Sequence, residues 1–141
     1  MEKKVRLTLT NRQTDGTGEV TVTKQSVTGQ YYEKDDGFYL LYEDSPEENG
    51  AASRNRIRLK GSVLELTKRG GISSRMVFEP GKEYVMDYVT PCGCLKMGIS
   101  TLNLETVRKE DWLLILLEYS LTSEGALISL CALEIQVLFP S

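Results

Sequence analysis

The chain has 141 residues, enough for one hydrophobic core, and we expect a single domain over residues 1–141. Hydrophobic residues at 40% and charged residues at 26% are ordinary for a globular protein, and no apolar run approaches the roughly 18 residues of a membrane span. The net charge of −3 argues against nucleic-acid binding over the whole surface, which normally requires a basic domain.

The start of the chain and its cysteines indicate a cellular compartment. The first residues pass directly into an alternating pattern with no apolar signal segment, and the cysteines are odd in number. We therefore expect a cytoplasmic protein with reduced thiols and no membrane contact.

Nearly every segment alternates apolar and polar residues with the period of two that is typical of strands. The expected strands cover residues 5–10, 19–32, 38–43, 54–60, 63–69, 73–79, 83–88, 95–99, 112–121 and 126–139. Between them lie turn sequences rich in glycine, proline and aspartate, at 15–18, 34–37, 61–62, 70–71, 80–81, 90–93 and 123–125.

Three features interrupt this regular pattern. Gly29 lies inside a segment that is long for one strand, at a point where glycine allows a bend or a bulge. The alternation changes phase at Thr101 and Leu102, which predicts a β-bulge. Residues 44–53 are the longest polar connection, and residues 45–48 within it are compatible with one helical turn.

The segments 112–121 and 126–139 form the longest hairpin, which we expect at the centre of the sheet. A three-residue loop at 123–125 would join them, with Gly125 in the left-handed position. In this register one face is almost wholly apolar, and its members are Leu113, Ile115, Leu117, Tyr119, Leu121, Leu127, Ser129, Cys131, Leu133 and Ile135.

A two-residue loop at 61–62 determines the register of another hairpin. It places Ile57 opposite Leu66 on the apolar side of the pair. The reverse side then carries a row of basic residues, with Glu65 opposite Arg58.

About ten short-spaced antiparallel strands predict an all-β fold, either a sandwich or a barrel. Tight sequential hairpins favour an up-and-down meander, and a meander of this length avoids exposed edges by closing. The sequence therefore predicts a single closed antiparallel β-barrel of about 8–10 strands.

Short motifs run through nearly the whole chain, at 29–32 (GQYY), 39–43 (YLLYE), 69–71 (RGG), 76–78 (MVF), 88–93 (YVTPCG), 101 (T) and 118–121 (EYSL). Together they resemble the YwiB-like β-barrel proteins of Gram-positive bacteria, a family without assigned function. The resemblance implies a cytoplasmic barrel similar to the calycins, which include the lipocalins, and it brings no catalytic residues. The chain departs from true lipocalins because its only tryptophan, Trp112, comes late and no helix follows the last strand. Lipid transport is therefore not implied.

Residues that carry chemistry are few. The sequence contains no histidine, the commonest general base and metal ligand, and no phosphate-binding loop. Cys92, Cys94 and Cys131 would leave a zinc site one ligand short. Glu118 and Glu134 fall on one face of the long hairpin, where solvated charges are a simpler interpretation than paired acids. We expect a non-enzymatic protein with no metal and no cofactor.

Two sets of side chains are candidates for binding. The first set would line the barrel interior and comprises Tyr42, Met76, Phe78, Tyr84, Met86, Tyr88 and Met97. Flexible methionines and amphipathic tyrosines suit a small apolar ligand, although the same side chains would also simply fill a barrel. The second set forms a basic row on the outer face and comprises Arg54, Arg56, Arg58, Lys60, Arg69 and Arg75.

The two sets lead to two hypotheses about function. We expect binding of a small apolar ligand as the leading function. The alternative is an interaction module that holds an anionic partner, such as RNA or an acidic protein, on the basic row. A row of this kind is otherwise a solvated face.

Overall fold

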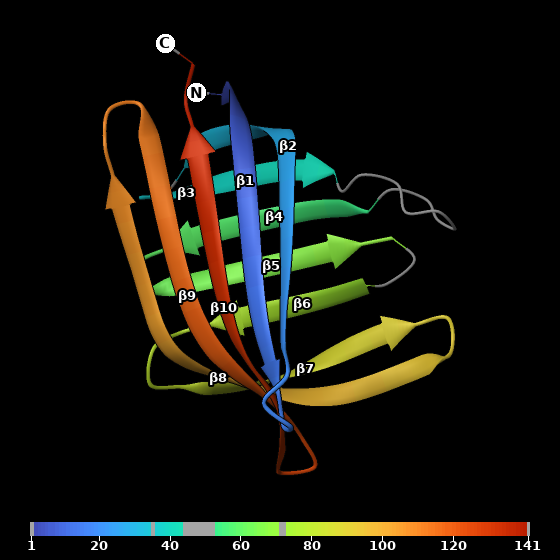
Figure 1. Cartoon of the computed structure of the whole chain (residues 1–141). Coiled ribbons are helices and arrows are strands. Elements are labelled where there is room, and N and C mark those ends of the chain that lie inside the picture. The colour runs from blue at the N-terminus through green and yellow to red at the C-terminus, as the bar shows by residue number, and fades with distance from the viewer. Residues whose placement is uncertain (1, 35, 44–52, 71–72, 141) are drawn as a thin grey trace.

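The computed structural model describes residues 2–34, 36–43, 53–70 and 73–140. These residues form ten strands and no helix (Figure 1), namely β1 (Glu2–Asp15), β2 (Val20–Lys34), β3 (Gly37–Glu43), β4 (Arg54–Lys60), β5 (Val63–Arg69), β6 (Ser73–Phe78), β7 (Glu83–Thr90), β8 (Gly93–Arg108), β9 (Trp112–Ser123) and β10 (Ala126–Leu138). The helical turn considered for residues 45–48 lies outside the described residues. In the described part of the chain, no helix is long and apolar enough to span a membrane.

The strands form a closed antiparallel barrel. Each strand pairs with its neighbour in the chain, and β1 also pairs with β10, from Arg6 opposite Leu138 to Asp15 opposite Ser129. This last pairing brings the two ends of the chain to the same side of the molecule (Figure 1). The all-β class, the up-and-down strand order and the closure predicted from the sequence are confirmed.

The strands run in two crossing sets, because β2 and β8 turn from one set into the other (Figure 1). β1, β9 and β10 belong to the first set, and β3 to β7 cross behind them. Gly29 lies where β2 passes from β1 to β3, opposite Val5 on one side and Tyr42 on the other. A Cβ atom at Gly29 would lie 2.6 Å from the Leu41 carbonyl oxygen, so a larger residue requires the backbone to shift.

The bend in β8 contains the predicted β-bulge. The register with β9 shifts between Thr101 and Asn103, and Leu102 is the extra residue, with 62% of its surface exposed. Thr101 also holds the loop between β6 and β7, because its hydroxyl accepts a hydrogen bond from the Glu79 N–H at 3.1 Å. The Thr101 N–H donates in turn to the Lys82 carbonyl at 3.4 Å.

The hydrophobic core lies between the two crossing sets of strands. Its completely buried members, each with 0% exposure, are Leu7, Leu40, Ile57, Leu64, Phe78, Ile99, Ile115, Ile135 and Val137. Burial of one such side chain contributes about 1.5–3 kcal/mol. The predicted register of the β4–β5 hairpin is confirmed, with Ile57 opposite Leu66 and Glu65 opposite Arg58.

The β9–β10 hairpin differs from the prediction at its loop. Two residues make the turn, Glu124 and Gly125, with φ angles of 52° and 80°. The prediction of a three-residue loop was therefore wrong. A register shift between Leu127 and Ser129 offsets the shorter loop, so Ser129 and the later residues still face the core as predicted. Leu127 lies before the shift and faces solvent, with 51% of its surface exposed.

Candidate functional site

The basic row occupies the outer face of β4, β5 and β6. On β4 the side chains of Arg54, Arg56, Arg58 and Lys60 alternate with core residues such as the buried Ile57. The register extends the row sideways, because Arg54 lies opposite Arg69 on β5. Arg56 lies opposite Thr67, which in turn lies opposite Arg75 on β6. The structure therefore brings all six predicted basic residues onto one continuous surface, which we call the basic face.

Glu65 organises the arginines at the centre of the basic face. Its carboxylate accepts two hydrogen bonds from Arg75, at 3.0 and 3.3 Å, and it lies 3.5 Å from Arg56 Nη2. Only 10% of the Glu65 side chain is exposed, whereas 68% of the Arg75 side chain is exposed. The hydrogen bonds from Arg75 lower the pKa of Glu65, and the charges of Arg56 and Arg58 act in the same direction against the effect of burial.

A second carboxylate lies at one end of the basic face. Glu43, the last residue of β3, is 3.7 Å from Arg54, and both side chains are mostly exposed, at 65% and 84%. An exposed pair of this length contributes little, because water screens both charges. Within the described parts of β3 to β6, the outer face therefore carries six cations and only two carboxylates, of which one is covered.

Two tyrosines border the basic face on the side of β2 and β3. Tyr39 lies opposite Arg58, whose guanidinium carbon is 5.8 Å from the centre of the Tyr39 ring. Tyr32 lies opposite Tyr39 on the other side, and the two ring centres are 6.1 Å apart at an interplanar angle of 43°. Both tyrosines are half-buried, so each residue is partly exposed to solvent.

The predicted lining residues mostly belong to the core. Phe78 and Met86 are buried at 0% and 4% exposure. Four others are half-buried and pack against the core, namely Tyr42, Met76, Tyr88 and Met97. Tyr84 is half-buried outside this group, and its hydroxyl donates a 2.7 Å hydrogen bond to Glu79 in the β6–β7 loop, which raises the pKa of Tyr84.

The centre of the barrel is filled by side chains. The core residues with 0% exposure come from both crossing sets of strands. An open cavity at this level would leave some of their surface accessible. Of the half-buried lining residues, Tyr42 and Tyr88 lie near the ends of β3 and β7, whereas Met76 lies in the middle of β6, opposite Leu66.

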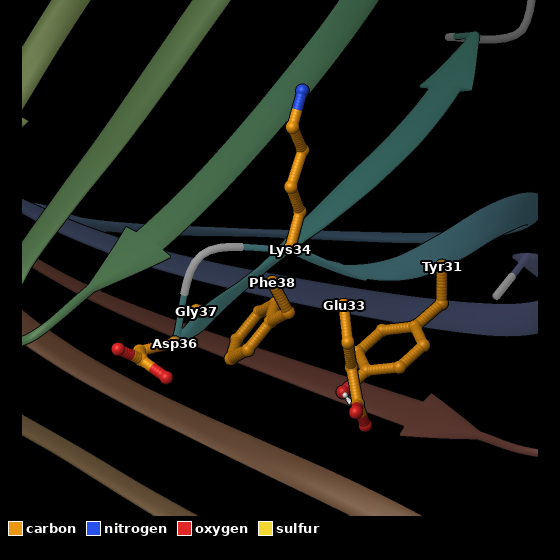
Figure 2. Close-up of a pocket in the computed structure, with 6 residues that line it drawn as sticks. All are labelled: Tyr31, Glu33, Lys34, Asp36, Gly37 and Phe38. Carbon is orange, nitrogen blue, oxygen red and sulfur yellow. Dashed lines mark hydrogen bonds between the residues drawn. The ribbon is translucent and has the colours of Figure 1, made fainter.

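A surface pocket of about 470 Å³ lies at the turn between β2 and β3 (Figure 2). Its described lining consists of Tyr31, Glu33, Lys34, Asp36, Gly37 and Phe38. The Tyr31 hydroxyl donates to Glu33 at 3.0 Å, and burial together with this carboxylate raises the pKa of Tyr31. In Figure 2 the Lys34 side chain points away from the two rings.

The composition of this pocket gives it no evident chemistry. Tyr31 and Phe38 are 4% and 9% exposed, so their rings belong mainly to the core and offer a ligand little surface. Phe139 packs edge-on against Tyr31 at 4.9 Å, and Arg108 lies 4.0 Å from the Phe139 ring centre. The sequence indicated only a turn here, because the two rings alternate with polar residues as core residues do in any strand.

The cysteines and the paired glutamates lie at different places in the structure. Cys131 is buried, and its sulfur lies 3.5 Å from the Ser129 hydroxyl oxygen. The burial of Tyr119 is the main cause that raises the pKa of its hydroxyl, and the neighbouring Cys131 thiol acts in the same direction. Cys92 and Cys94 are exposed at the β7–β8 turn. Among the described residues, no three acidic or cysteine side chains are grouped so as to hold a metal ion. Glu118 and Glu134, both exposed, lie opposite Ala132 and Leu116 on the outer surface.

Ten antiparallel strands closed through β1 and β10 place the molecule in the class of up-and-down β-barrels. Residues 7–135 match the family described as "Domain of unknown function (DUF1934)", and the chain belongs to this family. Its fold is similar to the solved structure titled "Crystal structure of ywiB protein from Bacillus subtilis", with a TM-score of 0.87 and 19% sequence identity over 99% of this chain and 94% of that chain. The predicted resemblance to YwiB-like barrels is confirmed, and at this identity the solved structure shows the fold alone. Among curated proteins, no match was found.

Proposed function

We propose that the protein is a non-catalytic binding module that holds an anionic partner on its basic face. One observation carries this proposal: six arginine and lysine side chains share a surface with two carboxylates, although the whole chain has a net charge of −3. A cluster of one sign attracts a partner of the opposite sign and accelerates its association.

The two carboxylates leave most of this positive charge effective. Glu65 is covered by the arginines that it binds, so a partner approaching from solvent meets the guanidinium groups first. Glu43 is exposed, but it lies at the end of β3 beside Arg54 only. The centre of the basic face is thus a cationic surface with a buried counter-charge that holds it in place.

A small apolar ligand at one mouth of the barrel is the second candidate. Tyr42 and Tyr88 lie near the ends of β3 and β7, and both are half-buried against the core. In an up-and-down barrel these ends meet at one mouth, and barrels related to the calycins bind ligands in such mouths. The filled centre would restrict a ligand to this region.

The test of the basic face compares two variants with equal charge changes. Lys60→Glu with Arg69→Glu reverses two exposed cations outside the Glu65 ion pairs. Arg12→Glu with Lys24→Glu makes the same change on β1 and β2. Fluorescence anisotropy would measure binding of labelled heparin, polyglutamate and an oligonucleotide, from about 50 to 200 mM salt.

We expect the parent protein to bind a polyanion with an affinity that falls steeply as salt rises, because neutralised anionic groups release counterions. The variant on the basic face should lose about tenfold or more in affinity, and the β1–β2 control should retain it. Equal losses in the two variants, binding that does not depend on salt, or no binding to any of the three probes would contradict the proposal.

A further inference from the structure

We infer that the anionic partner is single-stranded nucleic acid, with its sugar–phosphate backbone along β4 and its bases on Tyr39 and Tyr32. This inference rests on the proposed function and specifies the class of partner. It follows from the spacing of the cations on β4 and from the place of the tyrosines beside them.

The cations on β4 form a regular track. Arg54, Arg56, Arg58 and Lys60 occupy every second position of one strand, so their Cα atoms are about 6.8 Å apart. The phosphates of an extended single strand recur at a similar interval, so successive phosphates can each meet one cation. A small anion such as free phosphate would use one or two of these positions and leave the others without a role.

The tyrosines lie at the correct side and distance for bases. Adjacent strands are about 4.8 Å apart, so Tyr39 on β3 is one strand from the track and Tyr32 on β2 is two strands from it. A base extends sideways from its phosphate over distances of this order. Aromatic side chains beside a cationic groove are the common arrangement in proteins that bind single strands, because every base has a π-face.

Arg58 connects the track to the tyrosines. Its guanidinium already lies over the Tyr39 ring at 5.8 Å, so it can contact a phosphate or extend the stack with its own planar face. On the other side of β4, Glu65 holds Arg56 and Arg75 in place without presenting its own charge to solvent. The preferred partner therefore has both negative charge and flat aromatic groups.

This combination favours a single strand over the other polyanions. A duplex offers the same phosphates, but its bases are stacked inside the helix and cannot reach the tyrosine rings. An acidic peptide offers carboxylates and no planar groups for Tyr32 and Tyr39. Both alternatives would use the cations alone, and this difference makes the tyrosines the feature to test.

The experiment uses the full chain with three fluorescein-labelled probes: an oligo(U) of about 12 nucleotides, a duplex of the same length and polyglutamate. Anisotropy titrations would compare the parent protein with Tyr32→Leu/Tyr39→Leu, which removes both π-faces and keeps apolar bulk. Tyr32→Phe/Tyr39→Phe retains the rings and is the matched control. Thermal unfolding would establish that each variant is folded.

We expect the parent protein to bind oligo(U) more tightly than the duplex and polyglutamate. The leucine variant should lose about tenfold or more for oligo(U) only, and the phenylalanine variant should bind like the parent. Equal affinity for all probes with no effect of the leucine changes would overturn the single-strand inference and leave the proposed function in place. No binding to any probe would overturn both.

A second measurement applies if the leucine variant unfolds. Tyr39→Trp introduces a fluorophore at the proposed stacking position, and stacking of a base should quench its emission. Trp112 on β9 supplies the background, which the parent protein records under the same conditions. Emission that does not change when oligo(U) saturates the variant would contradict the inference.

Discussion

Arg75 on β6 donates two hydrogen bonds to Glu65 on β5, from Nε to Oε1 at 3.0 Å and from Nη2 to Oε2 at 3.3 Å. A forked contact of this kind determines the orientation of the guanidinium as well as its position. Arg56 on β4 approaches the same carboxylate at 3.5 Å, so one covered anion joins three strands. The arginines at the centre of the basic face are therefore held in place before any partner binds.

Glu65→Gln should destabilise the protein by about 1 kcal/mol at neutral pH. The amide retains the shape of the side chain but loses the charge-assisted hydrogen bonds. The effect is limited because Arg75 is mostly exposed and solvent screens its charge. Urea unfolding would show a lower midpoint with an unchanged m value.

The control for this prediction is Glu43→Gln, which removes the exposed pair with Arg54. We expect it to change the free energy of unfolding by less than about 0.5 kcal/mol. An equal loss in the two variants would show that net charge, rather than the covered contact at Glu65, produces the effect.

The stabilisation by Glu65 should depend on pH. The pKa of Glu65 is lowered from its ordinary value of 4.5 in the folded protein, so the folded state favours the ionised carboxylate. The stabilisation is therefore fully present above pH 4.5 and is lost as the pH falls through the folded-state pKa below that value. The difference in unfolding free energy between the parent and Glu65→Gln, measured from neutral pH downward, should decrease in this acidic range. A difference that grows on acidification would contradict the assignment.

The strand pattern could be predicted because burial imposes it directly on the sequence. One side of each strand contacts the core, so Ile57 and Leu66 are apolar and Arg58 is not. Tight loops then determine which residues face each other, as the two-residue turn after β4 does. Register errors arise where a loop length is ambiguous. The left-handed conformation of Glu124 is unusual for a residue other than glycine, so it could not be predicted from the residue type.

The candidate site could be predicted only in part. Alternation on β4 was sufficient to place its cations on one outer face. The contact between Glu65 and Arg75 depends on the register of the β5–β6 hairpin, and only the pairing of Glu65 with Arg58 was predicted. The neighbourhood of Tyr32, Tyr39 and Arg58 joins three strands and was not recognised for the same reason.

Gly29→Ala should destabilise the protein by about 1–3 kcal/mol, because the added methyl group overfills the corner of β2. The new Cβ would lie 2.6 Å from a backbone oxygen of Leu41 and 2.8 Å from Leu7 Cδ1. Gly16→Ala is the control, since its Cβ would meet nothing closer than 4.0 Å. Denaturant unfolding of both variants would measure the difference, and equal stabilities would contradict the close approach at Gly29.

Met86→Trp distinguishes a filled barrel from one with a ligand cavity. Met86 is 4% exposed and lies within the same buried cluster as Phe78, so we expect the larger indole to destabilise the protein by about 1–3 kcal/mol. Val85→Trp is the matched control, because the adjacent side chain is 71% exposed on the outer surface. It should change stability by less than about 0.5 kcal/mol.

The contrary result for Met86→Trp would change the proposed function. If Met86→Trp were as stable as Val85→Trp, the indole would occupy a space inside the barrel. The 0% exposure of Phe78 and Ile99, which belong to the same buried cluster as Met86, indicates no such space. Titration with an apolar fluorescent dye would then decide between the two candidate functions. Dye binding by the parent protein that only Met86→Trp abolishes would establish an internal ligand site and favour it over the basic face. Destabilisation by Met86→Trp without dye binding by the parent would leave the outer surface as the place where this barrel meets its partner.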